Sequence, residues 1–540
     1  MRRTKLWPLK FRFPSHYHIG REKRKCQDIV GLMKPTTFVL LLCCVATACG
    51  QVVRHQGRFY YGDGTSSSVT DPSPALHKVQ IGASETIEQI SDHFDASNNG
   101  TFSQRYFVNE TQWNRPDTAK WDKFSPVLLC VGGEGPPLDK SVLIDSVHCS
   151  DMITYSYYRK SLTFALEHRF YGSSSPADDY ATDALNKYLS TEQAVQDIGE
   201  FIRQMKIKYN IPDSTPWITY GGSYPGMVAA IARQVLPDVV YAAVSSSAPI
   251  EASVAMPGYN EIVGLAYKTE SVGGSQQCFD VIKKSHEVIG EMLTTNEGRR
   301  TLEKDFKVCG GEGALDNELN QSMFASSGVV YLPAQGNDPA CTSPLCNIES
   351  ICENLTQSKA ATEYDTMVAL SAQMSSSCKF VSHAAEILAF KEKASPSRVW
   401  EYQTCSEWGF YMTCESDECP FVQGLPALEA AIDICKHAYD IDSDAITKNI
   451  AAANERYGGL NFPATRVIFV NGEIDPWRAN SVQKSPAASI AGSEPVHSTP
   501  GSSHHYWTHA PQESDNTDIV DARQAIIDQL DSWLFELESV

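Results

Sequence analysis

The stretch Trp217-Ile218-Thr219-Tyr220-Gly221-Gly222-Ser223-Tyr224-Pro225-Gly226-Met227 has the pattern of a buried strand, a tight turn and a helix of small residues. Ser223 stands at the apex of the turn. Gly221 and Gly222 allow the close backbone approach that such a turn needs. A serine in this place is exposed above the sheet at a helix N-terminus, where backbone N–H groups can bind an oxyanion. We therefore predict that Ser223 is a nucleophile and that the N–H of Tyr224 is an oxyanion donor.

The turn departs in one respect from the common G-x-S-x-G pattern. Pro225 occupies the position of the last glycine, and Gly226 follows it. A glycine-rich turn that carries an incidental serine is therefore an alternative interpretation. A serine hydroxyl also needs a base and an orienting carboxylate before it can act as a nucleophile. Residues elsewhere in the chain must decide between the two interpretations.

Candidates for both partners occur late in the chain. Asp475 follows the apolar run Val467 to Val470, and the segment Gly501 to Trp507 supplies His504. The order serine, aspartate, histidine is that of the α/β-hydrolases. Each late residue has an alternative role, because an aspartate before proline often caps a turn. The histidines at 504, 505 and 509 could instead bind a metal or lie on the surface.

A glycine-rich loop precedes the serine turn in the chain. It runs from Gly132 to Pro136, directly after the apolar run Val127 to Val131. The second oxyanion donor of an α/β-hydrolase usually comes from a loop in this place. We expect this donor to be the N–H of Gly133 or of Glu134.

Short apolar runs alternate with helical patterns through much of the chain. This rhythm predicts a parallel sheet covered on both faces. The rhythm fades after Pro249, and residues 252–395 are richer in helical spacing, polar residues and cysteines. We predict an α/β-hydrolase core formed by residues 51–251 and 396–540, interrupted by a mainly helical, disulfide-bearing cap at 252–395. The predicted strands are Val127 to Val131, Leu162 to Leu166, Trp217 to Tyr220, Tyr241 to Val244 and Val467 to Val470.

The first fifty residues differ from the rest, with ten basic and two acidic residues. The apolar segment Phe38 to Ala48 ends in small residues and is typical of a secretory signal peptide. Met33 directly precedes this element, so we expect it to be the start and residues 1–50 to be an extension plus signal. The alternative is a signal anchor with a long cytoplasmic tail. After cleavage we expect no stable membrane insertion.

Cysteines and glycosylation sequons both indicate the secretory pathway. Of the 16 cysteines, four lie at or before Cys49. The later ones lack histidines at ligand spacing, so we predict disulfides rather than a zinc site. We therefore expect a secreted protein or one of the lysosomal or vacuolar lumen. The candidate N-glycosylation sites are Asn99, Asn109, Asn320 and Asn354.

The net charge of −20 argues against nucleic acid or anionic membranes as partners, because both would be repelled. A homodimer is compatible with the sequence. The predicted chemistry requires neither a metal nor an organic cofactor.

Several sequence blocks occur in a fixed order across most of the chain. They are Asp92 to Phe94 with Thr101 to Tyr106, Gly132 to Pro136, Glu167 to Gly172, Leu189 to Ala194, the Ser223 turn, Trp400 to Glu407, and Asn471 to Trp477. In this order the blocks together resemble the prolyl-specific S28 serine peptidases, and their agreement is far more specific than any single motif.

The resemblance implies cleavage of peptide bonds on the carboxyl side of proline, with proline-containing peptides as substrates. It assigns Ser223, Asp475 and His504 as nucleophile, orienting carboxylate and base, and Met227 and Trp477 to the proline pocket. The segment Tyr506 to His509 departs from many relatives, so exopeptidase and endopeptidase action both remain open. The competing interpretations are an esterase or lipase, and a catalytically silent binding protein on the same fold.

Overall fold

The computed structural model describes residues 81–113, 125–393, 397–483 and 495–537. The predicted signal peptide and the expected start at Met33 lie outside the described residues. Within the described ranges, no helix is both long enough and apolar enough to cross a membrane.

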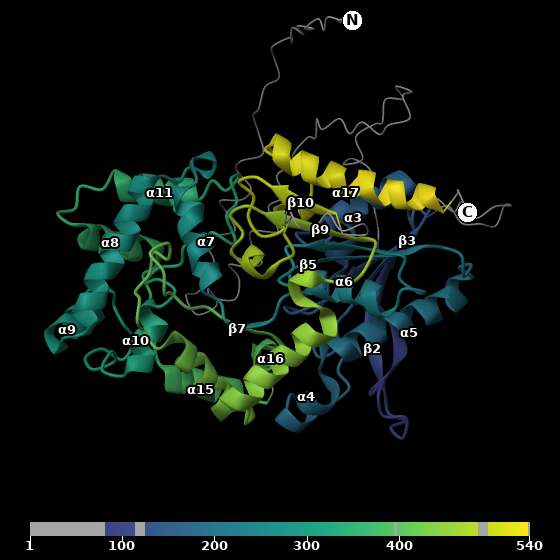
Figure 1. The fold of residues 1–540 in the computed structure, drawn as a ribbon, viewed down its shortest axis with the longest axis horizontal. Helices are drawn as coiled ribbons and strands as arrows, with labels where there is room; N and C mark the ends of the chain where they lie inside the picture. Colours follow the sequence, from purple (N-terminus) through teal and green to yellow (C-terminus); the bar gives the residue numbers. More distant parts are fainter. Residues whose placement is uncertain (1–80, 114–124, 394–396, 484–494, 538–540) are drawn as a thin grey trace, which may run out of the picture. The chain divides into compact units, whose positions relative to one another are not determined.

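An eight-stranded sheet lies at the centre of the fold (Figure 1). Its strand order is β1-β2-β4-β3-β5-β6-β9-β10, and the six strands from β4 to β10 in this order run parallel. The predicted parallel sheet is therefore extended at one edge by β1 and β2, which pair antiparallel. The strands are β1 (Glu85–Ile90), β2 (Thr101–Asn109), β3 (Val127–Val131), β4 (Thr163–Leu166), β5 (Trp217–Gly222), β6 (Ala242–Ser246), β9 (Val467–Gly472) and β10 (Val496–Thr499).

Both faces of the sheet are covered, because successive side chains of each central strand enter opposite layers. In β3, Val127 and Leu129 pack into one apolar cluster, whereas Leu128 and Cys130 pack into another. The first cluster includes α5 (Thr191–Tyr209) and α6 (Tyr224–Val235). The second includes α3 (Ser150–Arg159) and α17 (Thr517–Glu536). Two helical layers therefore enclose the sheet, as predicted for an α/β fold.

The helix α5 shows how local sequence signals fix these elements. The side chain of Ser190 caps its start by accepting a hydrogen bond from the Gln193 N–H, and Asn210 ends it in the left-handed conformation. Its apolar residues recur at helical spacing and are buried against the sheet. In the same way, the Asn516 side chain caps α17 by accepting from the Ile519 N–H.

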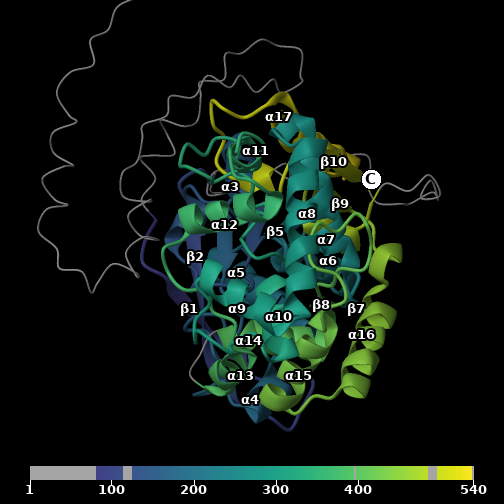
Figure 2. The ribbon, with the colours of Figure 1, turned by 90° about the vertical axis from the view of Figure 1, so that its left-hand side faces the viewer.

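A long helical insertion separates two neighbouring strands. β6 and β9 pair in parallel, with Ser246 opposite Val470, although the described residues between them add no strand to the large sheet. Figure 2 views the molecule from the side of this insertion. Its elements are β7 (Ser253–Ala255), α7 (Pro257–Lys268), α8 (Gln276–Leu293), α9 (Asn296–Asp305), α10 (Glu318–Ala325), α11 (Ile348–Thr356), α12 (Glu363–Met374), α13 (His383–Lys391), α14 (Ser397–Gln403), the π-helical turn η5 (Thr404–Trp408), β8 (Gly409–Tyr411), α15 (Ala427–Tyr439) and α16 (Ser443–Tyr457).

The insertion divides between two apolar clusters. Helices α7 to α12 form a cluster of their own, which the segment from Cys414 to Val422 joins. Residues of α14, η5, β8, α15 and α16 instead pack into the cluster of α5 and α6. This distribution favours a cap that comprises residues 252–395 and the short return segment 414–422. We put this forward as the domain division.

Six disulfides link the twelve cysteines of the described residues. The pair Cys130–Cys149 joins β3 to the start of α3, and Cys405–Cys435 joins η5 to α15. The prediction of disulfides in place of zinc is thus confirmed. The remaining pairs are Cys278–Cys352, Cys309–Cys378, Cys341–Cys346 and Cys414–Cys419.

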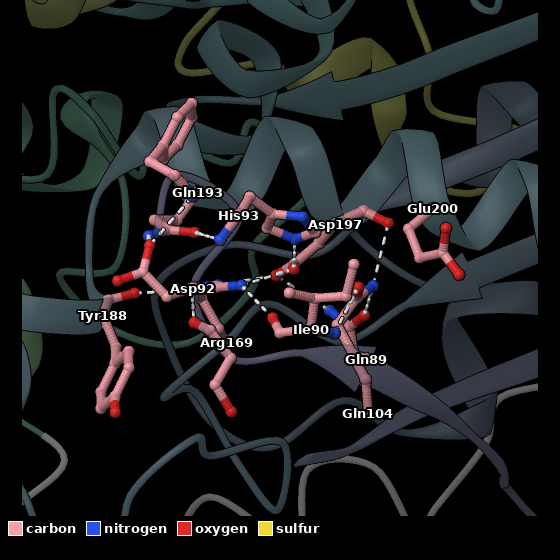
Figure 3. A network of polar contacts seen from close by, with 12 residues as sticks. Gln89, Ile90, Asp92, His93, Gln104, Arg169, Tyr188, Gln193, Asp197 and Glu200 are labelled. Carbon is pink, nitrogen blue, oxygen red and sulfur yellow. Dashed lines mark hydrogen bonds and ion pairs between the residues drawn. The ribbon is translucent and has the colours of Figure 1, made fainter. Parts of the chain in front are cut away.

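A buried ionic network anchors the β1–β2 hairpin to α5 (Figure 3). Arg169 is fully buried, and two of its nitrogens donate to the carboxylate of Asp197 at 2.6 and 2.7 Å. His93 contacts the same carboxylate through Nε2 at 2.8 Å. Arg169 also donates to the carbonyls of Ile90 and Tyr188. Removing either charge would leave the other buried and uncompensated, which typically costs about 3–5 kcal/mol.

A buried carboxyl on α3 makes stability depend on pH. Burial raises the pKa of Asp151 to about 7, although the Met152 N–H and Arg523 oppose the shift. The folded state therefore keeps a proton that the unfolded chain releases above about pH 4, so this group destabilises the fold increasingly between about pH 4 and pH 7. We expect Asp151→Asn to stabilise the protein at pH 7.5 by up to about 4 kcal/mol and to have little effect at pH 4. Thermal unfolding at both pH values measures this, and an equal shift at both would contradict it.

Candidate active site

Ser223 lies between β5 and α6, in a backbone conformation that residues other than glycine rarely adopt. Its φ is 64° and its ψ is −133°, and its N–H donates to the Ser246 carbonyl of β6 at 2.8 Å. The helix can return so close to the strand only because two residues lack side chains. A Cβ on Gly221 would lie 2.2 Å from the Pro225 carbonyl oxygen, and one on Gly226 would lie 2.9 Å from the Gly221 oxygen. The predicted strand, turn and helix are all present.

Pro225 is compatible with this turn because it falls in the first turn of α6, where a missing N–H costs no helical hydrogen bond. Its ring packs against the glycine-rich loop, since a Cβ on Gly133 would lie 2.3 Å from Pro225 Cγ. The Tyr224 N–H begins the helix and has no partner within it. The Gly132 N–H is bonded to the Leu166 carbonyl at 2.9 Å. The loop and the helix start thus lie side by side at the predicted oxyanion site.

Asp475 and His504 come together in the interior. Asp475 is fully buried, and both of its carboxylate oxygens lie close to His504 Nδ1, at 2.8 and 2.9 Å. Asp475 also accepts the Trp477 N–H at 3.0 Å, so it caps a turn in addition to holding the histidine. A carboxylate only accepts hydrogen bonds, so Nδ1 carries the proton and Nε2 bears the lone pair. Nε2 is buried and has no hydrogen-bond partner among the described residues.

The histidine loop packs against the serine turn through several contacts. The His505 N–H donates to Ser247 Oγ at 2.8 Å, and Trp507 donates to Ser246 Oγ at 3.0 Å. The His505 ring lies against Gly222, where a Cβ would be 3.0 Å from its Cγ. Its Nδ1 is bonded to Thr508, so His504 is the histidine that Asp475 holds. No hydrogen bond joins Ser223 to His504 Nε2, as is common in ligand-free sites.

Comparisons with known proteins agree with this geometry. Residues 89–526 match the family described as Serine carboxypeptidase S28. The chain belongs to the S28 serine peptidase family. Thymus-specific serine protease of Mus musculus is 32% identical over 84% of this chain and 87% of its own length. Lysosomal Pro-X carboxypeptidase of Mus musculus is 24% identical over 84% and 89%. A proline iminopeptidase structure from Mycobacterium smegmatis covers 84% of this chain and all of its own, with 12% identity and a TM-score of 0.37, too low to bear on function.

In this S28 peptidase the histidines around His504 are held neutral. Burial and the proximity of His504 lower the pKa of His148, and the same two causes hold the pKa of His505 well below its usual range. Burial lowers the pKa of His509 to about 4. Because these neighbours carry no charge near neutral pH, they do not oppose a positive charge that forms on His504.

The alternative of a metal site is not supported by the described residues. There, Glu401, Cys405 and Cys435 are the one group of metal-ligating side chains that lie close enough together. The two cysteines form a disulfide, which removes both thiolates. The histidines at 504, 505 and 509 do not form such a group in the described part of the chain.

The two predicted pocket residues occupy different environments. Trp477 is partly exposed, and its ring centroid is 6.3 Å from that of His504. Tyr259 and Phe410 pack edge-on against it, at 5.3 and 5.4 Å, and form an apolar surface beside His504. Met227 is fully buried in the core cluster that α6 joins. Sequence analysis did not find Tyr259 and Phe410, because they come from separate parts of the insertion and share no motif with Trp477.

A loop of the insertion contacts the histidine loop directly. The His504 N–H donates to the Gln335 carbonyl at 3.2 Å, and Ser503 Oγ donates to the Asn337 carbonyl at 2.7 Å. The Tyr259 hydroxyl donates to the Gln335 side chain at 2.8 Å. The cap therefore borders the candidate site and contributes to the backbone support of His504.

The four predicted glycosylation sites differ in accessibility. Asn99 is exposed in the β1–β2 loop, whereas Asn109 is only 5% exposed and its Nδ2 donates to the Leu143 carbonyl. The amide nitrogens of Asn320 and Asn354 donate to Ala314 and Gln373.

We expect Asn99 to carry a glycan in protein expressed through the secretory pathway and Asn109 to carry none, because a buried amide leaves no exit for a sugar. Peptide-N-glycosidase treatment in heavy-oxygen water, followed by mass spectrometry, reads the occupancy of each site. A glycan on Asn109 of the folded protein would contradict this expectation.

Proposed function

We propose that the chain is a secreted or lysosomal serine peptidase that hydrolyses peptide bonds on the carboxyl side of proline, with Ser223, Asp475 and His504 as its triad. The observation that carries the proposal is the orientation of His504. Asp475 holds its Nδ1 with both oxygens, and the buried Nε2 beside the strained serine turn has no partner in the described part of the chain. This is the arrangement required of a general base for a serine nucleophile.

In the proposed reaction, His504 Nε2 takes the proton of Ser223 Oγ while Oγ forms a bond to the substrate carbonyl carbon. The carbonyl oxygen becomes an oxyanion, which accepts hydrogen bonds from the Tyr224 N–H and from the N–H of Gly133 or Glu134. The carbon–nitrogen bond then breaks, and His504 gives its proton to the leaving amine. Water releases the acyl group from Ser223 by the same steps. Asp475 stays ionised and stabilises the imidazolium.

Preference for proline is supported by the apolar surface around Trp477. A pyrrolidine ring is compact and apolar, so it fits the apolar surface that Trp477 forms with Tyr259 and Phe410. Met227 remains the second proposed pocket residue. The name of the relative lysosomal Pro-X carboxypeptidase points to the same class of substrate. The six disulfides support an oxidising compartment, such as the extracellular space or an organelle lumen.

A peptide library with proline at varied positions tests the proposal. We expect cleavage after proline, and mass spectrometry of the products will show whether one C-terminal residue, an N-terminal dipeptide or an internal fragment is released. Simple esters are assayed in parallel. Turnover of esters without cleavage after proline would overturn the peptidase assignment in favour of an esterase. A folded protein that hydrolyses neither substrate and does not react with a fluorophosphonate would be a binding protein.

A further inference from the structure

The side chain of Tyr224, the residue after the nucleophile, ends in a buried polar cluster. Its hydroxyl contacts three groups from three parts of the fold: Thr191 Oγ1 at 3.1 Å, His168 Nε2 at 3.1 Å and Gln403 Nε2 at 2.8 Å. Tyr224 is 1% exposed. Three hydrogen-bond partners fix the position of a buried hydroxyl more tightly than packing around the ring would by itself.

The cluster continues to a carboxyl in the insertion. Glu407 lies in the π-helical turn η5, and its carboxyl contacts the N–H of Thr191 at 2.9 Å, Thr191 Oγ1 at 3.0 Å and Gln403 Nε2 at 3.3 Å. Trp408 Nε1 also donates to Thr191 Oγ1 at 3.3 Å. π-helical turns are rare and frequently occur at functional sites.

The protons of this cluster can be assigned from its geometry. His168 Nδ1 lies 2.7 Å from the Arg169 carbonyl, so Nδ1 carries the proton and Nε2 accepts one. Burial lowers the pKa of His168 to about 4, which keeps the ring neutral. The Tyr224 hydroxyl therefore donates to His168 Nε2, and its oxygen accepts from Gln403 Nε2.

Thr191 joins the tyrosine to the carboxyl. Its Oγ1 lies 3.1 Å from the Tyr224 hydroxyl and donates to Glu407 at 3.0 Å, and its N–H donates to the same carboxyl at 2.9 Å. Burial raises the pKa of Glu407, whereas its hydrogen bonds from Thr191 and Gln403 and the charge of Arg456 lower it. The contacts therefore run without a break from Glu407 through Thr191 and Tyr224 to His168.

We propose that Tyr224 is a positioning residue, whose hydroxyl is held by this series of hydrogen bonds so that its own backbone N–H points at the oxyanion. The inference deepens the proposed function and rests on it. Tyr224 is the first residue of α6, between the strained Ser223 and Pro225, whose ring packs on Gly133. Fixing the far end of the tyrosine side chain removes the remaining freedom of this peptide unit. Oxyanion donors act through such preorganised geometry.

Both ends of this series of hydrogen bonds are attached to rigid parts of the fold. Arg169, whose carbonyl accepts from His168, is bound by its guanidinium to Asp197 (Figure 3). Thr191 and Asp197 both belong to α5. The other end belongs to the insertion, so the segment that carries Gln403 and Glu407 supports the nucleophile turn directly.

The charged and titratable groups that face Glu407 are few. Arg456 of α16 lowers its pKa and pairs with Glu192. The phenols of Tyr171, Tyr224, Tyr402 and Tyr457 also lie within its electrostatic range, and all four titrate far above neutral pH. Glu134, whose pKa burial raises to about 8, also acts electrostatically on Tyr171 and Tyr224.

The first test removes the hydroxyl with Tyr224→Phe and compares it with Tyr439→Phe, another buried tyrosine, whose hydroxyl donates to the Arg398 carbonyl away from the turn. We expect Tyr224→Phe to lower kcat by roughly 10- to 100-fold with KM changed less than about three-fold, because the N–H acts on the transition state. Tyr439→Phe should change kcat less than about two-fold. A kcat of Tyr224→Phe within two-fold of wild type would overturn the proposal.

The second test keeps Tyr224 and changes Thr191, whose hydroxyl contacts the tyrosine hydroxyl. Thr191→Val removes the hydroxyl at constant volume, and Thr191→Ser retains it. We expect the serine variant to recover most of the kcat that the valine variant loses. Equal kcat losses in both variants would overturn the proposal, and thermal unfolding establishes that each variant is folded.

The third test changes the carboxyl with Glu407→Gln. A neutral amide cannot accept every hydrogen bond that the carboxyl accepts from Thr191 and Gln403, so kcat should fall while KM changes less than about three-fold. A kcat equal to that of wild type would overturn the role of Glu407. The rate of reaction with a fluorophosphonate, measured in every variant, separates the two levels of the argument. A wild-type enzyme that does not react removes the proposed function itself, whereas equal rates in wild type and Tyr224→Phe remove only this inference.

Discussion

Ser223→Ala should abolish reaction with fluorophosphonates and lower kcat for a proline-containing peptide by about 10⁶-fold. Without Oγ there is no atom to form the acyl-enzyme, and the remaining rate comes from substrate binding and the oxyanion donors alone. The structure around the site should persist, because the Ser223 contact to β6 is made by its backbone N–H and not by its hydroxyl. Activity-based labelling followed by peptide hydrolysis measures both effects.

Ser245→Ala is the matched control for this substitution. Ser245 is fully buried, and its hydroxyl donates to the Gly226 carbonyl at 2.9 Å, beneath the same turn. Its loss should change kcat less than about ten-fold, since one neutral hydrogen bond contributes about 1 kcal/mol. Persistent labelling of the Ser223→Ala protein would place the nucleophile elsewhere and contradict the assignment.

His504→Ala should lower kcat/KM by at least about 10⁴-fold, while His505→Ala should lower it less than about ten-fold. Only His504 is held by Asp475, so only its Nε2 is oriented as a base. His505 is bonded to Thr508 and packs on Gly222. The two variants remove the same side chain from adjacent positions, so the comparison isolates the role of orientation.

The steady-state assay is made with saturating and limiting substrate, and near-ultraviolet circular dichroism verifies packing around the site. Equal losses in the two variants would show that the loop as a whole, and not the Asp475-held imidazole, is required. A larger loss in His505→Ala would identify His505, and not His504, as the base and would overturn the proposed triad.

Much of the fold was predictable from local patterns. The apolar runs that became β3, β4, β5, β6 and β9 are fully buried in parallel strands, and such runs are long enough and apolar enough to recognise. The strands β1, β2 and β10 were not recognised. Their exposed and buried positions are mixed with polar residues, as expected near the edges of a sheet, so their apolar signal is weak.

The candidate site divides in the same way. The order of Ser223, Asp475 and His504, and the glycine-rich loop before them, can be read along the chain. Ser223, Asp475 and the loop each follow a recognisable buried strand, and the family resemblance assigns His504. The cluster that holds the Tyr224 hydroxyl could not be predicted from the sequence in this way. Its members His168, Thr191, Gln403 and Glu407 lie on separate elements, and only packing brings them into hydrogen-bond distance.

Local sequence was therefore sufficient to identify a strand, a glycine-dependent turn and a helix around Ser223, because sterics between neighbouring residues dictate that geometry. The family resemblance assigns His504, but the local sequence shows no physical difference between His504 and His505, and only the folded structure supplies one. These residues are adjacent and chemically identical, and the choice depends on a left-handed backbone at His505, with φ of 37°, and on the carboxylate of Asp475 reaching only one ring. The positions of His504 and His505 in the sequence do not encode their contacts with distant segments. Those contacts exist only once the sheet has brought the loops together.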